Sequence, residues 1–215
     1  MLFRSPTPTR VARRLRGLYA RTEGAVGEWR AAGEALRAAV AALIRALARL
    51  PVMAAGLEGA GRAGELWGGV GALEALGARQ VAAAGRLAER AATEARAREC
   101  SAGEVRRCAR AARDVLRAEL GAAGLPAEGT PEHQRLREGG GALPSALAYV
   151  EGLEEVRAML QDQAELDAAV LGRLIPGVAG PDAAELLQVL EEESCLDWGR
   201  VRELLDLGLV EVEDF

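Results

Sequence analysis

The apolar residues of the first fifty positions recur at the spacing of one helix face. From Leu15 onward the interval alternates between three and four residues, with two successive fours before Val40. This pattern aligns the side chains in a stripe that a partner helix covers. The two successive intervals of four residues locally relax the supercoil. The positions in the stripe are Leu15, Leu18, Thr22, Ala25, Trp29, Ala32, Leu36, Val40, Leu43, Leu47 and Leu50.

Helix-breaking residues divide the rest of the chain. Pro51 is expected to end a first helix that Thr9 caps, because proline lacks an amide donor and crowds the preceding turn. A Gly-rich stretch then predicts an internal loop over 51–69. A second internal loop is expected over 121–142, whose Pro, Gly and charged residues cannot bury a core.

Two further apolar stripes predict a second helix over about 70–120 and a third over 143–174. Ser101 and Glu104 have capping-box spacing, so the second helix is expected to break and restart there. No stretch shows the period of two that a strand requires. The chain is therefore predicted to be all-α, with three long helices in an elongated antiparallel bundle or coiled coil over 1–174.

Residues 175–215 are predicted to form an acidic C-terminal tail of short helices, two of them capped by Asp182 and Asp197. The run Glu191–Glu193 is interpreted as solvated surface and not as an acid–base group. Consecutive acids on a helix point in different directions, so they do not converge on one site.

Charge is distributed unevenly between the two ends. Residues 1–50 contain ten Arg and three acids, whereas residues 182–215 contain eleven acids and two Arg. This asymmetry is compatible with a nucleic-acid or acidic partner, with docking between the ends, or with a solvated basic helix face. The Arg-rich N-terminus also looks superficially like a mitochondrial presequence, but helical periodicity that continues past Trp29 favours an ordinary first helix. No apolar run of about 18 residues indicates a membrane span.

Candidate chemistry is sparse. The 215 residues include one His and no Lys, and all 27 basic residues are Arg, a bias that a GC-rich gene largely explains. Without Lys the chain has no P-loop lysine, Schiff base or pyridoxal anchor. Zinc-ligand spacing is absent from the set His133, Cys100, Cys108 and Cys195. An odd number of cysteines does not form a complete set of disulfides, which indicates a reducing compartment. We expect no enzyme activity, no catalytic residue, no cofactor and no metal.

Three segments, in order, resemble the AIRIM family, the ribosome maturation factors that associate with Afg-two-type AAA+ ATPases. The resemblance lies in the joint register of the segments over about two thirds of the chain, because each motif alone is an ordinary helical pattern. The third segment departs from the family, since acids outnumber Arg where relatives have basic and tyrosine residues. The segments are VARRLRGLYARTEGAVGEWRAAGEAL (11–36), LEALGARQVAAAGRLAERA (73–91) and PSALAYVEGLEEVRAMLQDQAELDAAVLGRL (144–174).

The resemblance implies a non-catalytic adaptor in a complex with a AAA+ unfoldase and a CINP-like helical protein. Such a complex acts on pre-60S ribosomal particles in the cytoplasm and on replisome proteins in the nucleus, so both locations are expected. Direct nucleic-acid binding is not predicted by any motif. The alternative is a generic coiled-coil scaffold of a cytoskeletal or kinetochore assembly, which would share the helical pattern but not these partners.

Four residues are singled out as a partner interface: Leu153, Val156, Leu160 and Trp29. The first three form the most compact apolar patch on the helix that best matches the family. Trp29 is the only large aromatic residue on the first stripe, and a large ring among small neighbours fills a hole in a facing helix. Either set fits an internal core or a partner surface, with internal packing against the third helix favoured for Trp29.

Overall fold

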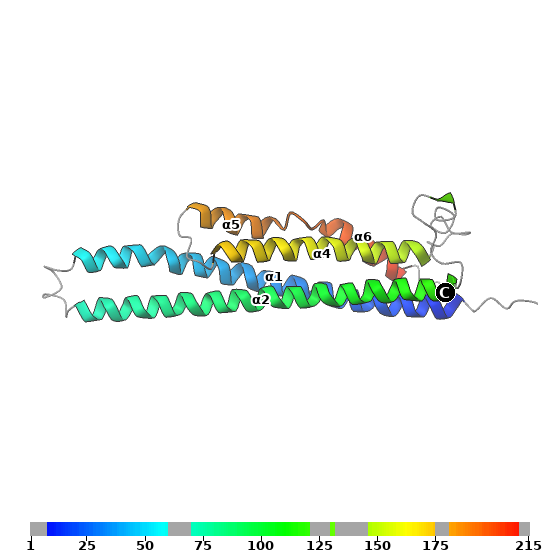
Figure 1. Cartoon of the computed structure of the whole chain (residues 1–215), viewed down its shortest axis with the longest axis horizontal. Coiled ribbons are helices and arrows are strands. Elements are labelled where there is room, and N and C mark those ends of the chain that lie inside the picture. Colours follow the sequence, from blue (N-terminus) through cyan, green and yellow to red (C-terminus); the bar gives the residue numbers. More distant parts are fainter. Residues whose placement is uncertain (1–7, 60–69, 121–129, 132–145, 175–180, 211–215) are drawn as a thin grey trace, which may run out of the picture. The chain divides into compact units, whose positions relative to one another are not determined.

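Most of the described chain is helical. The computed structural model describes residues 8–59, 70–120, 130–131, 146–174 and 181–210. These ranges contain five helices and no strand, which confirms the all-α class (Figure 1). None of the described helices is long and apolar enough to cross a membrane. The helices are α1 (Pro8–Gly59), α2 (Val70–Leu120), α4 (Ala146–Leu174), α5 (Pro181–Glu192) and α6 (Trp198–Val210).

The apolar stripes of α1 and α4 form buried faces, as their spacing predicts. Nine of the eleven stripe positions of α1 are buried, and Leu47 and Leu50 are half-buried. Thr22, the polar member of the stripe, donates its hydroxyl to the carbonyl oxygen of Leu18 at 2.9 Å, so the buried group is satisfied within its own helix. Seven α4 positions are likewise buried: Leu147, Val150, Leu153, Val156, Leu160, Val170 and Leu174.

Two expected helix breaks are absent. Helix α1 continues through Pro51 to Gly59, so the expected loop over 51–69 is wrong for its first nine residues, and 60–69 lie outside the described residues. Proline removes one hydrogen bond from the turn before it, but its own φ fits a helix, and good helix formers such as Ala54 and Ala55 follow it.

Helix α2 also continues without interruption through Ser101 and Glu104. The expected capping box does not form, because Ser101 is buried in the helix interior and the Glu104 carboxylate is paired with arginines. The spacing of a capping box recurs by chance inside helices, and only tertiary contacts tell the two situations apart.

The chain divides into two compact units, and each takes segments from both sides of residue 174. Unit 1 contains Met1–Trp29, Glu99–Gln163 and Cys195–Phe215, whereas unit 2 contains Arg30–Arg98 and Ala164–Ser194. Helix α6 thus belongs to unit 1 and helix α5 to unit 2. The division into a bundle over 1–174 and an acidic tail over 175–215 stays a prediction.

Unit 1 packs α1, α2, α4 and α6 together. The hydroxyl of Tyr19 donates to the Tyr149 carbonyl oxygen at 2.8 Å, and the two rings meet edge to face with centroids 5.5 Å apart. A Cβ at Gly152 would lie 3.1 Å from the Tyr19 hydroxyl and 3.4 Å from a Leu204 methyl group, so the glycine lets α4 lie close to both neighbours without a tight contact. Asp197 caps α6 as predicted, because its Oδ1 accepts from the Arg200 amide at 2.9 Å.

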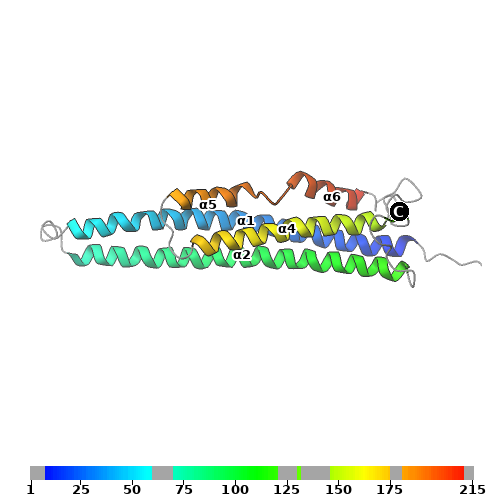
Figure 2. The same cartoon turned by 45° about the horizontal axis from the view of Figure 1, so that its top comes forward.

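Unit 2 places α5 on a core formed by α1, α2 and α4. Helices α1 and α2 lie side by side in both views (Figures 1 and 2) and are antiparallel here, since Ala46 lies near Ala84 while Gly33 lies near Arg98. Helix α5 begins at Pro181, so Asp182 is the second residue of its first turn and not the predicted cap before the helix. The apolar core of this unit contains Leu36, Ala39, Val40, Ala91, Val170, Leu171, Leu174, Ala183, Leu186 and Leu190.

Candidate functional site: a partner-binding surface

The four residues predicted to form a partner interface are all buried within the single chain. Trp29, Leu153, Val156 and Leu160 are each 0 % exposed. Trp29 therefore packs internally, as favoured from the sequence. The third-helix patch is core and not surface, so a partner could reach it only if the fold opened. Helical periodicity marks these positions as apolar-facing, but it cannot tell which apolar face the chain covers by itself.

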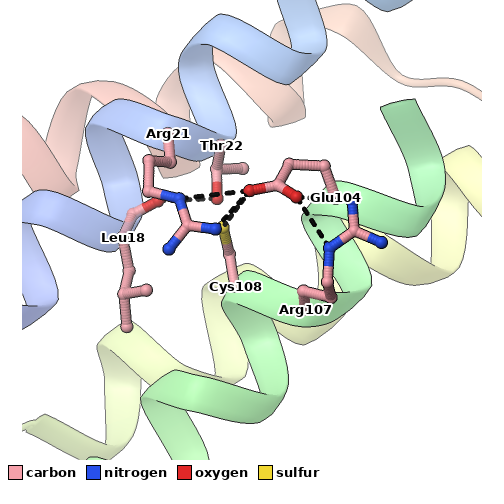
Figure 3. A network of polar contacts seen from close by, with 6 residues as sticks. All are labelled: Leu18, Arg21, Thr22, Glu104, Arg107 and Cys108. Atoms are coloured by element: carbon pink, nitrogen blue, oxygen red, sulfur yellow. Dashed lines mark hydrogen bonds and ion pairs between the residues drawn. The ribbon is translucent and has the colours of Figure 1, made fainter. Parts of the chain in front are cut away.

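One polar cluster in unit 1 links α1 to α2 (Figure 3). Glu104 accepts hydrogen bonds from Arg21 of α1, and its other oxygen lies 2.6 Å from Nη2 of Arg107, one turn along α2. The hydrogen bond from Arg21, followed by that from Arg107, lowers the pKa of the Glu104 carboxyl. The cluster is a structural ion-pair network at the helix seam, because its carboxylate is held ionised by two guanidinium groups.

Cys108 lies beneath this cluster. Its thiol is 3.9 Å from Oε1 of Glu104, and burial raises the pKa of the Cys108 thiol. A reactive cysteine needs a lowered pKa and an exposed sulfur, and Cys108 has neither. The Cys108 side chain is therefore a packing residue in this position. Cys100 is exposed and Cys195 half-buried, and all three cysteines are free.

A second polar cluster lies in the interior of unit 2, around Arg98. Arg98 is 1 % exposed and donates from Nη1 to Asp167 at 2.6 Å and from Nη2 to Glu193 at 2.8 Å. The same Glu193 oxygen accepts from Arg37 at 2.6 Å. Burial lowers the pKa of Arg98, while the two carboxylates oppose that shift. The buried Arg98 is thus paired with two carboxylates, and the half-buried Arg37 adds a second cation beside Glu193.

The backbone around Arg98 is adapted to this cluster. A Cβ on Gly33 would lie 3.2 Å from the guanidinium carbon of Arg98, a tight contact, so the glycine leaves room on α1 for the Arg98 side chain. Glu193 follows α5 with a φ of 42°, a left-handed conformation common just after a helix. This geometry turns the carboxylate inward, and Glu193 is 9 % exposed.

The expectation for the run Glu191–Glu193 is therefore wrong for one of its three members. Glu191 and Glu192 are exposed, as expected of a solvated helix face, whereas Glu193 pairs with two arginines. No local signal separates Glu193 from its neighbours, because its role comes from Arg37 and Arg98 on distant segments.

Neither cluster has the composition of a catalytic centre. Each pairs carboxylates with guanidinium groups that stay protonated, so no group is placed to take and return a proton near neutral pH. Among the described residues, no three His, Cys, Asp or Glu side chains come together in a way that could hold a metal ion. His133 lies outside the described residues.

The large hydrophobic residues most exposed in the described chain all belong to unit 2. Val52 of α1 is 72 % exposed, and Leu76 and Val81 of α2 are 51 % and 59 % exposed. A groove of about 520 Å³ runs over this region between the two helices. Val81 does not line the groove. The lining residues are Arg45, Ala48, Arg49, Val52, Leu76 and Gln80.

Gln80 fixes the two helices beside the groove. Its Nε2 donates to the carbonyl oxygen of Ala46 at 3.2 Å, a contact between α2 and α1. This contact gives Gln80 a structural role at the seam of the two helices.

Comparisons with known proteins identify no relative. No protein-family model matches the chain, and neither the curated proteins nor the solved structures give a significant match.

Proposed function

We propose that this protein is a non-catalytic adaptor subunit of a AAA+ unfoldase complex that acts in pre-60S ribosomal subunit maturation and in replisome protein turnover. The observation that carries the proposal is the joint register of the three segments that resemble the AIRIM family. Most stripe positions of the first and third segments are buried in the fold, so their register concerns residues on which the packing depends, whereas Leu76 and Val81 of the second segment are exposed.

The chemistry of the chain suits an adaptor. The most buried charged groups of the described chain, Arg98, Asp167 and Glu193, pair with one another and with Arg37, and these pairs link helices. ATP hydrolysis is assigned to the ATPase partner, because this chain has no lysine to hold the phosphates of a P-loop. The proposed partners are an Afg-two-type AAA+ ATPase and a CINP-like helical protein, with pre-60S particles reached through that complex and the protein shared between cytoplasm and nucleus.

Affinity purification followed by mass spectrometry tests the assignment. A tagged chain should enrich peptides of a AAA+ ATPase and of a CINP-like protein. A bait carrying Leu153→Asp and Val156→Asp should lose them, because two charges in the core unfold the chain. A Val81→Ser bait is the matched control, since this exposed side chain should be replaceable without loss of the fold.

A second measurement concerns activity. The purified chain should not hydrolyse ATP, but it should change the ATPase rate of the AAA+ partner when the two are mixed. Enrichment of cytoskeletal or kinetochore proteins without any AAA+ ATPase would favour the alternative, a generic coiled-coil scaffold. Turnover of ATP by the chain alone, surviving removal of contaminants, would contradict the adaptor assignment.

A further inference from the structure

The groove of unit 2 has the form of a surface site and not of an enclosed ligand pocket. Of its six lining residues, five are exposed and Gln80 is half-buried. Small-molecule sites bury most of their ligand, which a trough of exposed side chains cannot do. The groove instead runs along the seam of two helices, the kind of surface that receives a third helix.

The floor of the groove is apolar. Ala48 and Val52 lie one turn apart on α1, and Leu76 faces them from α2. Val52 and Leu76 are two of the three large hydrophobic residues that the described chain leaves most exposed, so covering them removes apolar surface from water.

The charged residues of the lining are both basic. Arg45 and Arg49 lie one turn apart on α1, and the lining contains no carboxylate. Within the described part of the chain, neither guanidinium group forms an ion pair, unlike Arg21, Arg98 and Arg200. Two available guanidinium groups beside an apolar floor are complementary to carboxylates that flank apolar side chains.

We propose that this groove binds an acidic amphipathic helix of a partner protein. Leucine-like side chains of that helix lie on Ala48, Val52 and Leu76, and two carboxylates one turn apart pair with Arg45 and Arg49. Arg45 and Arg49 are four residues apart on α1, and two carboxylates four residues apart on the partner helix lie on one face. That face can therefore pair with both guanidinium groups. The proposal rests on the binding role under "Proposed function", because it names the partner chemistry of an adaptor surface.

Nucleic acid is the less suitable occupant. A phosphate backbone could contact the two arginines, but it would leave the apolar floor uncovered, and no aromatic side chain lines the groove for base stacking. A second copy of this chain is also tested below.

The test uses the full chain and three fluorescent helical peptides of about five turns each. The first has a leucine stripe flanked by glutamates, the second has arginines in place of the glutamates, and the third has serines in place of the leucines. Fluorescence anisotropy should detect binding of the first peptide only, with affinity that falls as salt rises. Failure of the first peptide to bind, or equal binding of the third, would overturn the proposal.

Paired variants locate the binding. Two double variants should each lower the affinity for the first peptide by about tenfold or more. One is Arg45→Glu with Arg49→Glu, and the other is Val52→Ser with Leu76→Ser. The charge control is Arg90→Glu with Arg96→Glu, which changes net charge equally at exposed positions about 15 Å or more along α2 from Gln80. The apolar control is Val81→Ser. Equal loss in either control would overturn the proposal, and circular dichroism checks that each variant is folded.

Two further arms separate the other occupants. A labelled single-stranded oligonucleotide that binds more tightly than the acidic peptide, and is lost in the Arg45 and Arg49 variant, would assign the groove to nucleic acid. Sedimentation that shows a dimer, converted to monomer by Val52→Ser with Leu76→Ser, would assign it to a second copy. The peptide assay contains no AAA+ protein, so its result does not depend on co-purification of the ATPase. Either experiment can fail while the other succeeds, and the two proposals can therefore be told apart.

Discussion

The Arg98 cluster of unit 2 and the Glu104 cluster of unit 1 contain the same kinds of group but lie in different environments. Around Arg98 the cation and Asp167 are 1 % and 2 % exposed, whereas the Arg21 that pairs with Glu104 is largely exposed to solvent. Water screens the pair at Glu104 and can replace either partner there. Inside unit 2 no such replacement exists, so each charge depends on the others.

Burial, and not the nitrogen–oxygen distance, therefore decides how strongly an ion pair of this protein constrains the fold. Both clusters contain short nitrogen–oxygen contacts, at 2.6 Å for Arg98 with Asp167 and for Arg107 with Glu104. The buried cluster specifies where α5 ends against the core, because an inverted or shifted helix would leave its charges unpaired. The exposed cluster adds little such constraint.

The largest effect is expected from Arg98→Met. Methionine fills the space but removes the buried guanidinium group that pairs with Asp167 and Glu193, so the free energy of unfolding should fall by roughly 3–5 kcal/mol. Urea denaturation followed by circular dichroism measures the loss. The loss should shrink at acid pH, because a protonated carboxyl group can be buried neutral. Arg96→Met, at an exposed position of the same helix, is the control, and an equal loss there would remove the distinction between buried and exposed arginines.

A smaller effect is expected from Glu193→Gln. The amide keeps an acceptor oxygen for Arg98 but removes the negative charge, while Arg98 still has Asp167, so a loss of about 1–3 kcal/mol is expected. Glu191→Gln is the matched control, since Glu191 is exposed in the same acidic run. Comparable stability of the two variants in urea denaturation would show that the run is solvated throughout.

Glu104→Gln should change stability least of the three substitutions at neutral pH. The pKa of Glu104 is lowered in the folded state, so its contribution is present above its ordinary value of 4.5 and is lost as pH falls through the folded pKa. The difference in stability between the native chain and the variant should therefore disappear in acid. Urea titrations at several pH values measure it, with Glu99→Gln as the control. A difference that grows in acid would contradict the sign of the shift.

The labelling rates of the cysteine thiols measure how accessible the core next to the Glu104 cluster is to solvent. Disulfide-exchange labelling of the native chain should modify exposed Cys100 first and buried Cys108 last, because burial keeps Cys108 protonated and out of reach. Cys100→Ser should remove the fast phase, and Cys108→Ser the slowest. Loss of the fast phase in the Cys108 variant would mean that the seam under Glu104 is open.

The all-α class, the presence of three long helices and the buried faces of α1 and α4 follow from the sequence alone. Helical periodicity is a local property, so α2 begins and ends at the expected residues, and the stripes of α1 and α4 are buried. The cap at Asp197 was also predictable, because the donor it satisfies lies three residues along the chain.

Only the tertiary structure decided how those faces are used. From sequence, Leu153 and Trp29 each fit a core or an interface, with internal packing favoured for Trp29, and both are buried in the structure. Glu193 looks like its solvated neighbours until Arg98, 95 positions away, pairs with it. The groove lined by Arg45 and Leu76 likewise exists only because two helices bring distant residues together. Pairing between distant residues leaves no periodic trace in a single sequence.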